Sequence, residues 1–201
     1  QHDRFLGGAL SLEVLGCFAM TERGHGSDVQ SLETTITFDP EAGDFVVHSP
    51  KESSAKTYIG NAAAHGHMAA VFGQLIVDAT EHGVHCILVP IRDDDGSVHD
   101  GVTIGDNGHK GGLIGVDNGW ISFDHVRVGR DLLLDRFGSV NADGQYESSI
   151  ENPNRRFFSM LGALVRGRIC IGGGAALATR RRYRAAADEL EPKKRLSALL
   201  D

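Results

Sequence analysis

Hydrophobic and polar residues alternate in short runs along the first two thirds of the chain, and glycine, aspartate and asparagine separate the runs. Alternation puts every second side chain on the same face of an extended strand, so it predicts strands with one buried face. The turn-forming stretch 39–44 predicts a hairpin. The expected strands cover residues 34–38, 44–48, 69–77, 84–91, 102–105 and 118–128.

From Pro153 onward the pattern changes, because apolar residues recur at helical spacing and β-branched residues become rare. This predicts one long helix. The run Gly172–Gly174 costs a helix about 1 kcal/mol per glycine, so it indicates close packing or a break at that point. Pro192 is expected to end the helix. The fold class is therefore mainly β, an antiparallel sandwich or flattened barrel followed by an α-helical segment, and α+β overall.

Composition excludes several classes of protein. Hydrophobic residues make up 41% and charged residues 23% of the 201 residues, as in a globular domain. No apolar run approaches the ~20 residues of a membrane span, and a net charge of -7 argues against nucleic-acid binding. The three cysteines, Cys17, Cys86 and Cys170, have apolar neighbours, which predicts buried, reduced thiols and a reducing compartment.

Metal binding and secretion are not indicated either. The histidine-rich stretches 65–67 and 82–86 lack the spacing of dependable zinc sites, so we predict no metal ligands. The N-terminus lacks the charged and apolar regions of a signal peptide. Because the chain does not begin with methionine, we expect a segment of a longer protein, in which targeting signals could lie elsewhere.

The most specific pattern is Thr21-Glu22-Arg23-Gly24-His25-Gly26-Ser27, which is followed by Leu32-Glu33-Thr34-Thr35. It resembles the T-E-x-G-H-G-S-x-x-x-x-L-E-T-T block of acyl-CoA oxidases, a branch of the acyl-CoA dehydrogenase superfamily. The dehydrogenases of that superfamily carry a related T-E-x-x-x-G-S-D block. Agreement at so many fixed positions is far more specific than a lone glycine pattern.

Two further blocks are similar to the same family. Residues 53–63 resemble its S-S-K-W-x-x-G segment, with Thr57 and Tyr58 where tryptophans are usual. Residues 105–131 contain counterparts of its G-D-x-G-x-K, D-N-G and R-x-P-R segments, with Gly129 in place of the proline. The resemblance implies the end of an N-terminal helical domain at 1–15, a flavin-facing middle β domain at 16–137, a linker at 138–153 and the start of a C-terminal helical domain at 154–201.

The resemblance also assigns roles to individual residues. It implies FAD as the cofactor, with Thr21 donating its hydroxyl or backbone amide to the flavin edge near N5. Gly60 matches the flavin-contacting glycine, where backbone can approach the ring closely. Met20 and Tyr58 would line the same pocket. Ser27 matches the serine that touches the CoA part of the substrate.

The implied reaction is FAD-dependent oxidation of acyl-CoA thioesters to trans-2-enoyl-CoA in fatty acid β-oxidation, with electrons passed to dioxygen to form hydrogen peroxide. The family's catalytic glutamate lies far downstream, so this chain is expected to contain no catalytic residue, to be inactive alone and to bind FAD weakly. Glu22 is not that base. By resemblance the full protein is a homodimer or homotetramer, cytoplasmic in a bacterium or peroxisomal in a eukaryote.

Other interpretations stay open. A dehydrogenase that passes electrons to an electron-transfer flavoprotein fits most of the same residues, although Gly24-His25-Gly26 and the Leu-Glu-Thr-Thr block favour an oxidase. A non-catalytic β-sandwich binding module is the alternative outside the enzymes, and in it the residues around Ser27 and Gly60 would be ordinary turns. The arginines at 180–184 suit a solvated helix face as well as FAD phosphates, so they receive no role.

Overall fold

The computed structural model describes the backbone of residues 2–200 and the side chains of residues 4–162 and 164–187. The chain divides into two compact units, Gln1–Phe157 and Phe158–Asp201. The first unit contains all the strands found in the described residues. The prediction of a mainly β fold followed by helices is confirmed.

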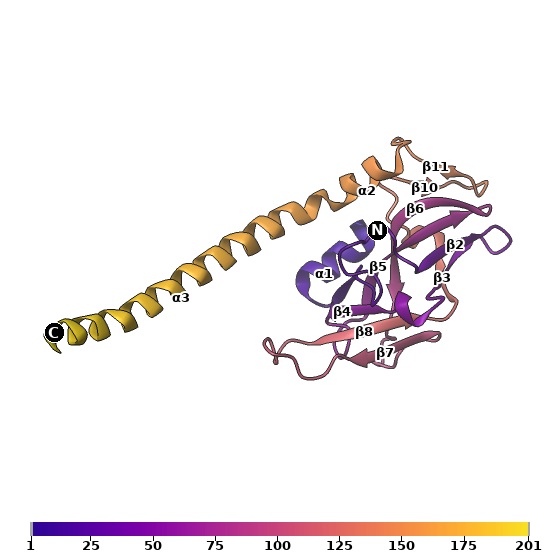
Figure 1. The fold of residues 1–201 in the computed structure, drawn as a ribbon. Coiled ribbons are helices and arrows are strands. Elements are labelled where there is room, and N and C mark those ends of the chain that lie inside the picture. Colours follow the sequence, from indigo (N-terminus) through magenta and orange to yellow (C-terminus); the bar gives the residue numbers. More distant parts are fainter. Residues whose placement is uncertain (1, 201) are drawn as a thin grey trace. The chain divides into compact units, whose positions relative to one another are not determined.

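The larger sheet of the first unit has six strands and is centred on the long strand β5 (Figure 1). β6 pairs antiparallel with one edge of β5, so β1 and β2 share the other edge, one after the other. Both of these pairs are parallel, which differs from a wholly antiparallel sandwich. The strands are β1 (Gly16–Ala19), β2 (Thr35–Asp39), β3 (Asp44–His48), β5 (Met68–Val77), β6 (Thr80–Pro90) and β9 (Val126–Gly129).

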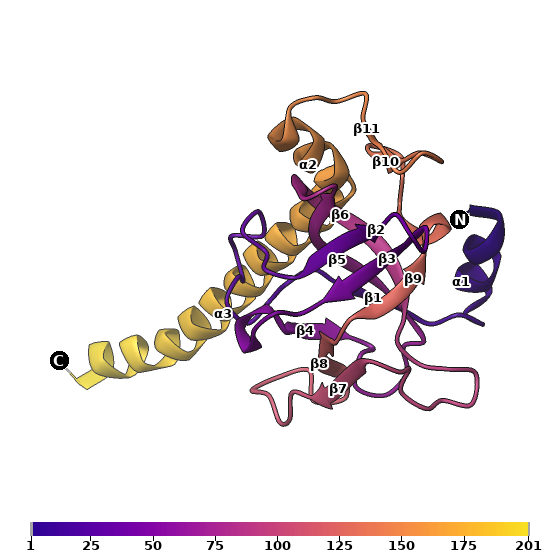
Figure 2. The same cartoon turned by 90° about the vertical axis from the view of Figure 1, so that its right-hand side faces the viewer.

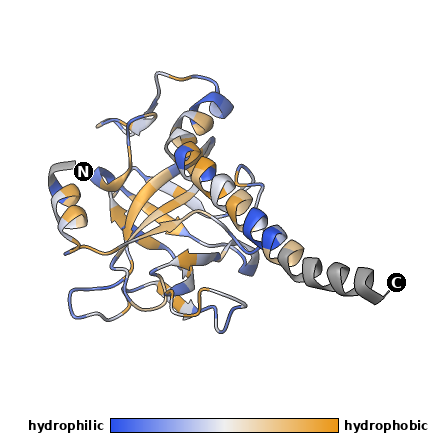
Figure 3. Cartoon of the chain, turned by 90° about the vertical axis from the view of Figure 1, so that its left-hand side faces the viewer, coloured by the Kyte–Doolittle hydropathy of each residue, from blue (hydrophilic) through white to orange (hydrophobic). Residues whose placement is uncertain are grey.

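A second, antiparallel sheet has the order β4-β8-β7 and lies beside the first (Figure 2). Its strands are β4 (Lys56–Gly60), β7 (Val102–Asp106) and β8 (Asn118–Phe123). Alternate residues of the two sheets form one hydrophobic core, which includes Phe45 and Ile87 of the larger sheet and Ile121 and Phe123 of the smaller one. The hydrophobic positions of the strands can be followed in Figure 3.

The predicted strands agree with those observed to within a few residues, and the hairpin at 39–44 is confirmed by the pairing of Asp39 with Asp44. The run at 118–128 splits at His125, whose φ of 52° turns the chain from β8 in one sheet into β9 in the other. The strand prediction missed β1 and β4, which are short and flank the motif blocks.

The remaining elements of the first unit are short. A π-helical turn η1 (His2–Leu6) and helix α1 (Gly7–Ser11) precede β1. Single 3-10 turns, η2 (Glu52–Ser54) and η3 (Arg130–Leu132), connect strands. The predicted linker, residues 138–153, contains a small hairpin of β10 (Ser139–Val140) and β11 (Tyr146–Glu147), and its last residue begins the first helix of the helical region.

The helical region consists of α2 (Pro153–Leu161), a 3-10 turn η4 (Gly162–Leu164) and α3 (Val165–Leu200). The predicted helix is thus interrupted at η4. Gly172–Gly174 do not break α3, and among the described residues of the second unit a side chain added at these glycines would meet nothing within 4 Å. α3 also continues through Pro192, because a cost of about 3 kcal/mol disfavours a helix without forbidding it.

No single helix in the described residues is long and apolar enough to cross a membrane, and only the bent pair Pro153–Leu161 and Val165–Ala187 passes that test of length and composition. The three cysteines are free, as predicted, but Cys170 is exposed rather than buried. Burial raises the pKa of Cys17 to about 11 and that of Cys86 to about 12, so both thiols stay protonated.

Candidate functional site

The segment that follows β1 carries the first motif block and lies against the start of β4. The Thr57 amide donates to the Thr21 carbonyl at 2.9 Å, and the Arg23 amide donates to the Ala55 carbonyl at 3.0 Å. Glu22 and Lys56 form an isolated antiparallel bridge between these bonds. Two motif blocks that are far apart in the sequence are therefore joined by their backbones.

Glu22 and Lys56 also form an ion pair, with 2.9 Å between Oε1 and Nζ and neither side chain exposed. The other two ammonium protons go to the carbonyls of Met20 (3.1 Å) and Phe72 (2.6 Å). Burial lowers the pKa of Lys56 to about 8 against the opposing attraction of Glu22. A buried charge pair is tolerated only when its hydrogen bonds are complete, and Lys56 meets this condition with three acceptors.

The Leu-Glu-Thr-Thr block completes the same cluster. The Glu22 carboxylate accepts from the Glu33 amide (2.7 Å), the Thr34 amide (2.9 Å) and the Thr34 hydroxyl (2.6 Å). The Glu33 carboxylate binds the Ser53 hydroxyl and Lys51 Nζ, and these two bonds lower the pKa of Glu33. Motif residues thus hold one another in place, which explains why these residue types occur at this spacing.

β4 contains an irregularity at Tyr58. The register between β4 and β8 shifts between Lys56 and Ile59, and Tyr58 has a φ of 57°, in the left-handed region that non-glycine residues rarely occupy. The Tyr58 side chain is 70% exposed. Gly60, the last residue of β4, is exposed too, and a Cβ there would meet no atom within 4 Å.

The loop that follows Gly60 is held from both sides. The buried Arg92 donates to the carbonyls of Ala62, Ala63 and Gly66. The Asp117 carboxylate accepts from the backbone amides of residues 63, 64 and 65. Burial acts to raise the pKa of Asp117, but these bonds and one from the His65 ring outweigh it and lower the pKa. Two charged side chains therefore hold the backbone that directly follows Gly60.

Four of the five predicted site residues lie on β4 or in the segment bonded to it: Tyr58 and Gly60 on the strand, Met20 and Thr21 beside it. Thr21 lies opposite Thr57, which precedes Tyr58, and Gly60 lies three residues beyond Thr57 on the same strand. The Met20 side chain is only 6% exposed, so this residue contributes mainly its backbone. Ser27 is exposed in the turn that follows Gly24.

Sequence reasoning missed Lys56, Arg92 and Asp117. Lys56 and Asp117 lie within the S-S-K-W and D-N-G blocks, so the motifs contained both residues, but the motifs alone did not reveal what either side chain does. Arg92 lies just after β6, in a stretch with no quoted motif. Only the spatial contacts reveal that each of the three holds a backbone segment of the candidate site.

Comparison with known proteins decides the family. The sequence model described as "Acyl-CoA dehydrogenase, middle domain" matches residues 17–126, more than half of the chain. This chain belongs to the acyl-CoA dehydrogenase family. The matched range contains the motif cluster, β4 and the loop held by Arg92 and Asp117, so the site described above lies within the family's middle domain.

Within that family the chain is most like oxidases among the relatives compared. It is 51% identical over 156 residues to the mouse acyl-coenzyme A oxidase-like protein (78% of this chain, 24% of the relative) and 45% identical over 175 residues to Arabidopsis thaliana peroxisomal acyl-coenzyme A oxidase 3 (87% and 26%). A Caenorhabditis elegans acyl-CoA oxidase-1 structure complexed with FAD and ATP superposes with a TM-score of 0.72 at 38% identity, covering 74% of this chain and 23% of that one. The chain thus spans about a quarter of these relatives.

Among the residues that the structure describes, two groups of side chains offer several metal-ligand atoms within 4.8 Å of one another. In the group Glu22, His25 and Glu33, both carboxylates already accept the hydrogen bonds described above. In the group His48, Asp124 and His125, the two imidazole rings stack at 3.9 Å and 24°. The two ring planes are therefore nearly parallel and stacked, so one ion cannot lie in the plane of both rings, where a histidine nitrogen binds a metal.

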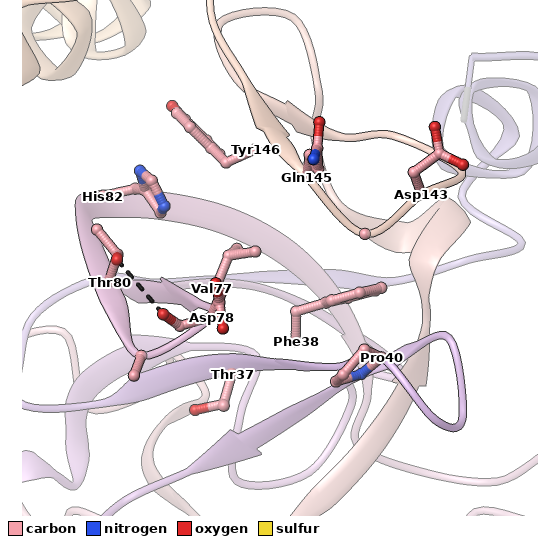
Figure 4. A pocket seen from close by; sticks show the side chains of 12 residues that line it. Thr37, Phe38, Pro40, Val77, Asp78, Thr80, His82, Asp143, Gln145 and Tyr146 are labelled. Carbon is pink, nitrogen blue, oxygen red and sulfur yellow. Dashed lines mark hydrogen bonds between the residues drawn. The ribbon is translucent and has the colours of Figure 1, made fainter.

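A pocket of about 610 Å³ lies between the β5–β6 turn, Phe38 and the β10–β11 hairpin (Figure 4). The rings of His82 and Tyr146 stack at its edge, 3.9 Å apart. Tyr146 is also bonded to His85 Nε2 at 3.0 Å. None of the predicted site residues lines this pocket, so it is separate from the motif cluster.

Proposed function

We propose that this chain forms the flavin-facing β domain of an FAD-dependent enzyme that oxidises acyl-CoA thioesters to trans-2-enoyl-CoA. The observation that carries the proposal is that the half-buried Thr21 is bonded to β4, that the exposed Gly60 ends the same strand, and that charged side chains hold the backbone next to each of them. Family membership and the similarity to named acyl-CoA oxidases support the same reaction.

The residues on β4 suit the edge of a flavin ring. The Thr21 amide donates no hydrogen bond to the described residues, so it is available to an acceptor on the ring. Gly60 has open space where a side chain would stand, which permits close approach of a flat cofactor. Tyr58, which is exposed and stands between Thr57 and Gly60 on β4, could also contact the flavin ring. Thr21, Tyr58, Gly60 and the Met20 backbone would therefore hold FAD.

FAD, when bound, supplies the acceptor for a hydride from the β-carbon of the thioester, while a base outside these residues removes the α-proton. Thr21 would donate to the edge of the ring near N5 and would so stabilise the electron-rich reduced flavin. Ser27, in the exposed turn, contacts the CoA part of the substrate. This chain's share of catalysis is thus positioning of cofactor and substrate rather than proton transfer.

We further propose dioxygen as the electron acceptor, with hydrogen peroxide as its product. The Gly-His-Gly turn and the Leu-Glu-Thr-Thr block support an oxidase, as do the names of the relatives. The full protein would be a homodimer or homotetramer that joins the domains at 1–15, 16–137 and 154–201 through the segment 138–153. It would be peroxisomal in a eukaryote, as the name of the Arabidopsis relative suggests, or cytoplasmic in a bacterium.

Titration of the isotope-labelled chain with FAD, followed by amide chemical shifts, tests the flavin site even when binding is weak. We expect FAD-dependent shifts at Thr21, Thr57 and Gly60 and none at Gly43, a turn glycine of the β2–β3 hairpin. No shift at these three amides, or shifts centred on the pocket beside Tyr146, would contradict the flavin site and favour a non-catalytic binding module.

A domain exchange tests the reaction. Residues 16–137 replace the corresponding segment of the C. elegans acyl-CoA oxidase-1, and FAD content and hydrogen peroxide release with acyl-CoA are measured. We expect a flavin-loaded chimera that releases peroxide. A loaded chimera that oxidises acyl-CoA only with an electron-transfer flavoprotein would identify a dehydrogenase, and a loaded but inert chimera would refute the proposed reaction.

A further inference from the structure

Lys56 acts on the very peptide group that the proposed function places at the flavin. Its ammonium donates to the Met20 carbonyl at 3.1 Å. That carbonyl and the Thr21 amide belong to one peptide bond, which is planar and trans. The N–H therefore points away from the C=O, and fixing the Met20 oxygen fixes the direction in which the Thr21 amide donates.

The ammonium is itself held rigidly. Its remaining two bonds go to Glu22 and to the Phe72 carbonyl on β5. Glu22 is tied in turn to the Thr34 amide and hydroxyl. Because neither charged side chain is exposed, no water competes for these bonds. The Met20–Thr21 peptide is thus anchored to the core of the larger sheet by one cation.

A cation on a carbonyl oxygen does more than orient it. Charge-assisted hydrogen bonds are about twice as strong as neutral ones, and successive hydrogen bonds polarise one another. Electron density drawn toward the Met20 oxygen leaves the Thr21 N–H more positive and a better donor. A stronger donor favours an electron-rich acceptor most, and a reduced flavin is more electron-rich than an oxidised one.

We infer that Lys56, held by Glu22, is a positioning residue that orients and polarises the Met20–Thr21 peptide and so strengthens binding of reduced flavin over oxidised flavin. The inference rests on the proposed flavin site and adds to it the residue that tunes the redox preference. Glu22 supplies the counter-charge that keeps the ammonium in the core. Neither side chain touches the cofactor itself, since both are fully buried.

The test compares the affinities for oxidised FAD and for dithionite-reduced FAD without oxygen, both from amide-shift titrations. The variant is the double substitution Lys56→Met and Glu22→Gln, which removes both buried charges together and so avoids an unpaired one. Lys51→Met is the matched control, because it makes the same change on a lysine that is 67% exposed and bonded to Glu33.

We expect the double variant to lose about tenfold in affinity for reduced FAD, equivalent to about 1.4 kcal/mol, and less than about threefold for oxidised FAD. The control keeps the ratio of the wild-type chain. A folded double variant in which the ratio of the two affinities is unchanged, with or without equal losses in both, would show that the pair is only structural and would overturn the inference. Absence of FAD shifts in the wild-type chain refutes the proposed function instead.

A second test uses the wild-type chain, so it can be carried out even if the double variant does not fold. Two titratable groups face Lys56: Glu22, and Cys86 of β6, which stays protonated because burial raises its pKa to about 12. We expect the preference of the wild-type chain for reduced FAD to fall as pH rises through about 8, where Lys56 loses its proton. The pH dependence of free FAD is measured in parallel and subtracted. A preference that is constant across this range counts against the inference.

Discussion

The backbone amide of Thr57 donates to the carbonyl of Thr21 at 2.9 Å, and this bond joins two motif blocks that the sequence keeps far apart. It sets the first block along β4, above the buried pair of Glu22 and Lys56. The exposed Tyr58 and Gly60 follow on the same strand. The candidate site thus combines two exposed residues of β4 with a neighbouring segment that a buried ion pair anchors.

Removal of one member of the buried pair should destabilise the chain strongly. Lys56→Met leaves the Glu22 carboxylate without its counter-ion in the core, which costs about 3–5 kcal/mol in free energy of unfolding. Adding Glu22→Gln should recover most of that loss. Urea unfolding measures both, with Lys51→Met as a control expected to change stability by less than about 1 kcal/mol. A Lys56→Met chain as stable as the wild type would contradict the described pair.

Substitution by alanine should affect stability differently at two glycines near the end of β4. Gly60→Ala meets open space, so unfolding free energy should change by less than about 0.5 kcal/mol while the FAD-dependent shifts weaken. Gly66→Ala would overlap Cys17 Sγ and lie 2.8 Å from the Asn61 carbonyl, so it should destabilise by about 1–3 kcal/mol. Thermal unfolding and FAD titration of both variants check this. Unchanged FAD binding by Gly60→Ala would remove Gly60 from the site.

The left-handed conformation of Tyr58 should be measurable as strain. Alanine at this position keeps a Cβ at a φ of 57°, whereas glycine removes it. We expect Tyr58→Gly to be more stable than Tyr58→Ala by about 1 kcal/mol, the reverse of their usual order in a strand. Denaturant unfolding of the two variants gives the difference directly. If Tyr58→Ala proves the more stable, the bulge is not strained as described.

His85 should make stability depend on pH. Its side chain is buried, and burial lowers its pKa from 6.5 to about 4. As pH falls, His85 therefore binds a proton near pH 6.5 in the unfolded chain, but only near pH 4 in the folded chain. The contribution of His85 to the free energy of unfolding is therefore fully present above pH 6.5 and is lost as pH falls toward 4, which lowers the free energy of unfolding by about 3 kcal/mol.

Unfolding free energies measured between these two pH values test the His85 prediction. His85→Gln should remove most of the decrease, because glutamine does not titrate there. His125→Gln is the matched control, since the His125 side chain is 68% exposed, and it should keep the decrease. The same pH dependence in the His85→Gln chain would assign the effect to other groups.

The sequence by itself determined where most strands lie and which family the chain resembles. Alternation is a local property, so the strands at 34–38, 44–48 and 69–77 are visible without knowledge of their partners. The hairpin at 39–44 is equally local. The motif blocks identified Thr21, Gly60 and Ser27 as candidates through their residue types and spacing, before any contact between them was known.

Only the tertiary structure decided which segments meet. No local pattern states that β1 and β2 share one edge of β5, that Lys56 reaches Glu22, or that Arg92 and Asp117 hold the loop after Gly60. These contacts join residues far apart in the chain, and they form because buried charges and backbone groups must find partners wherever the fold supplies them. Periodicity encodes which face of a strand is buried, whereas the partner that it meets depends on how the whole chain closes.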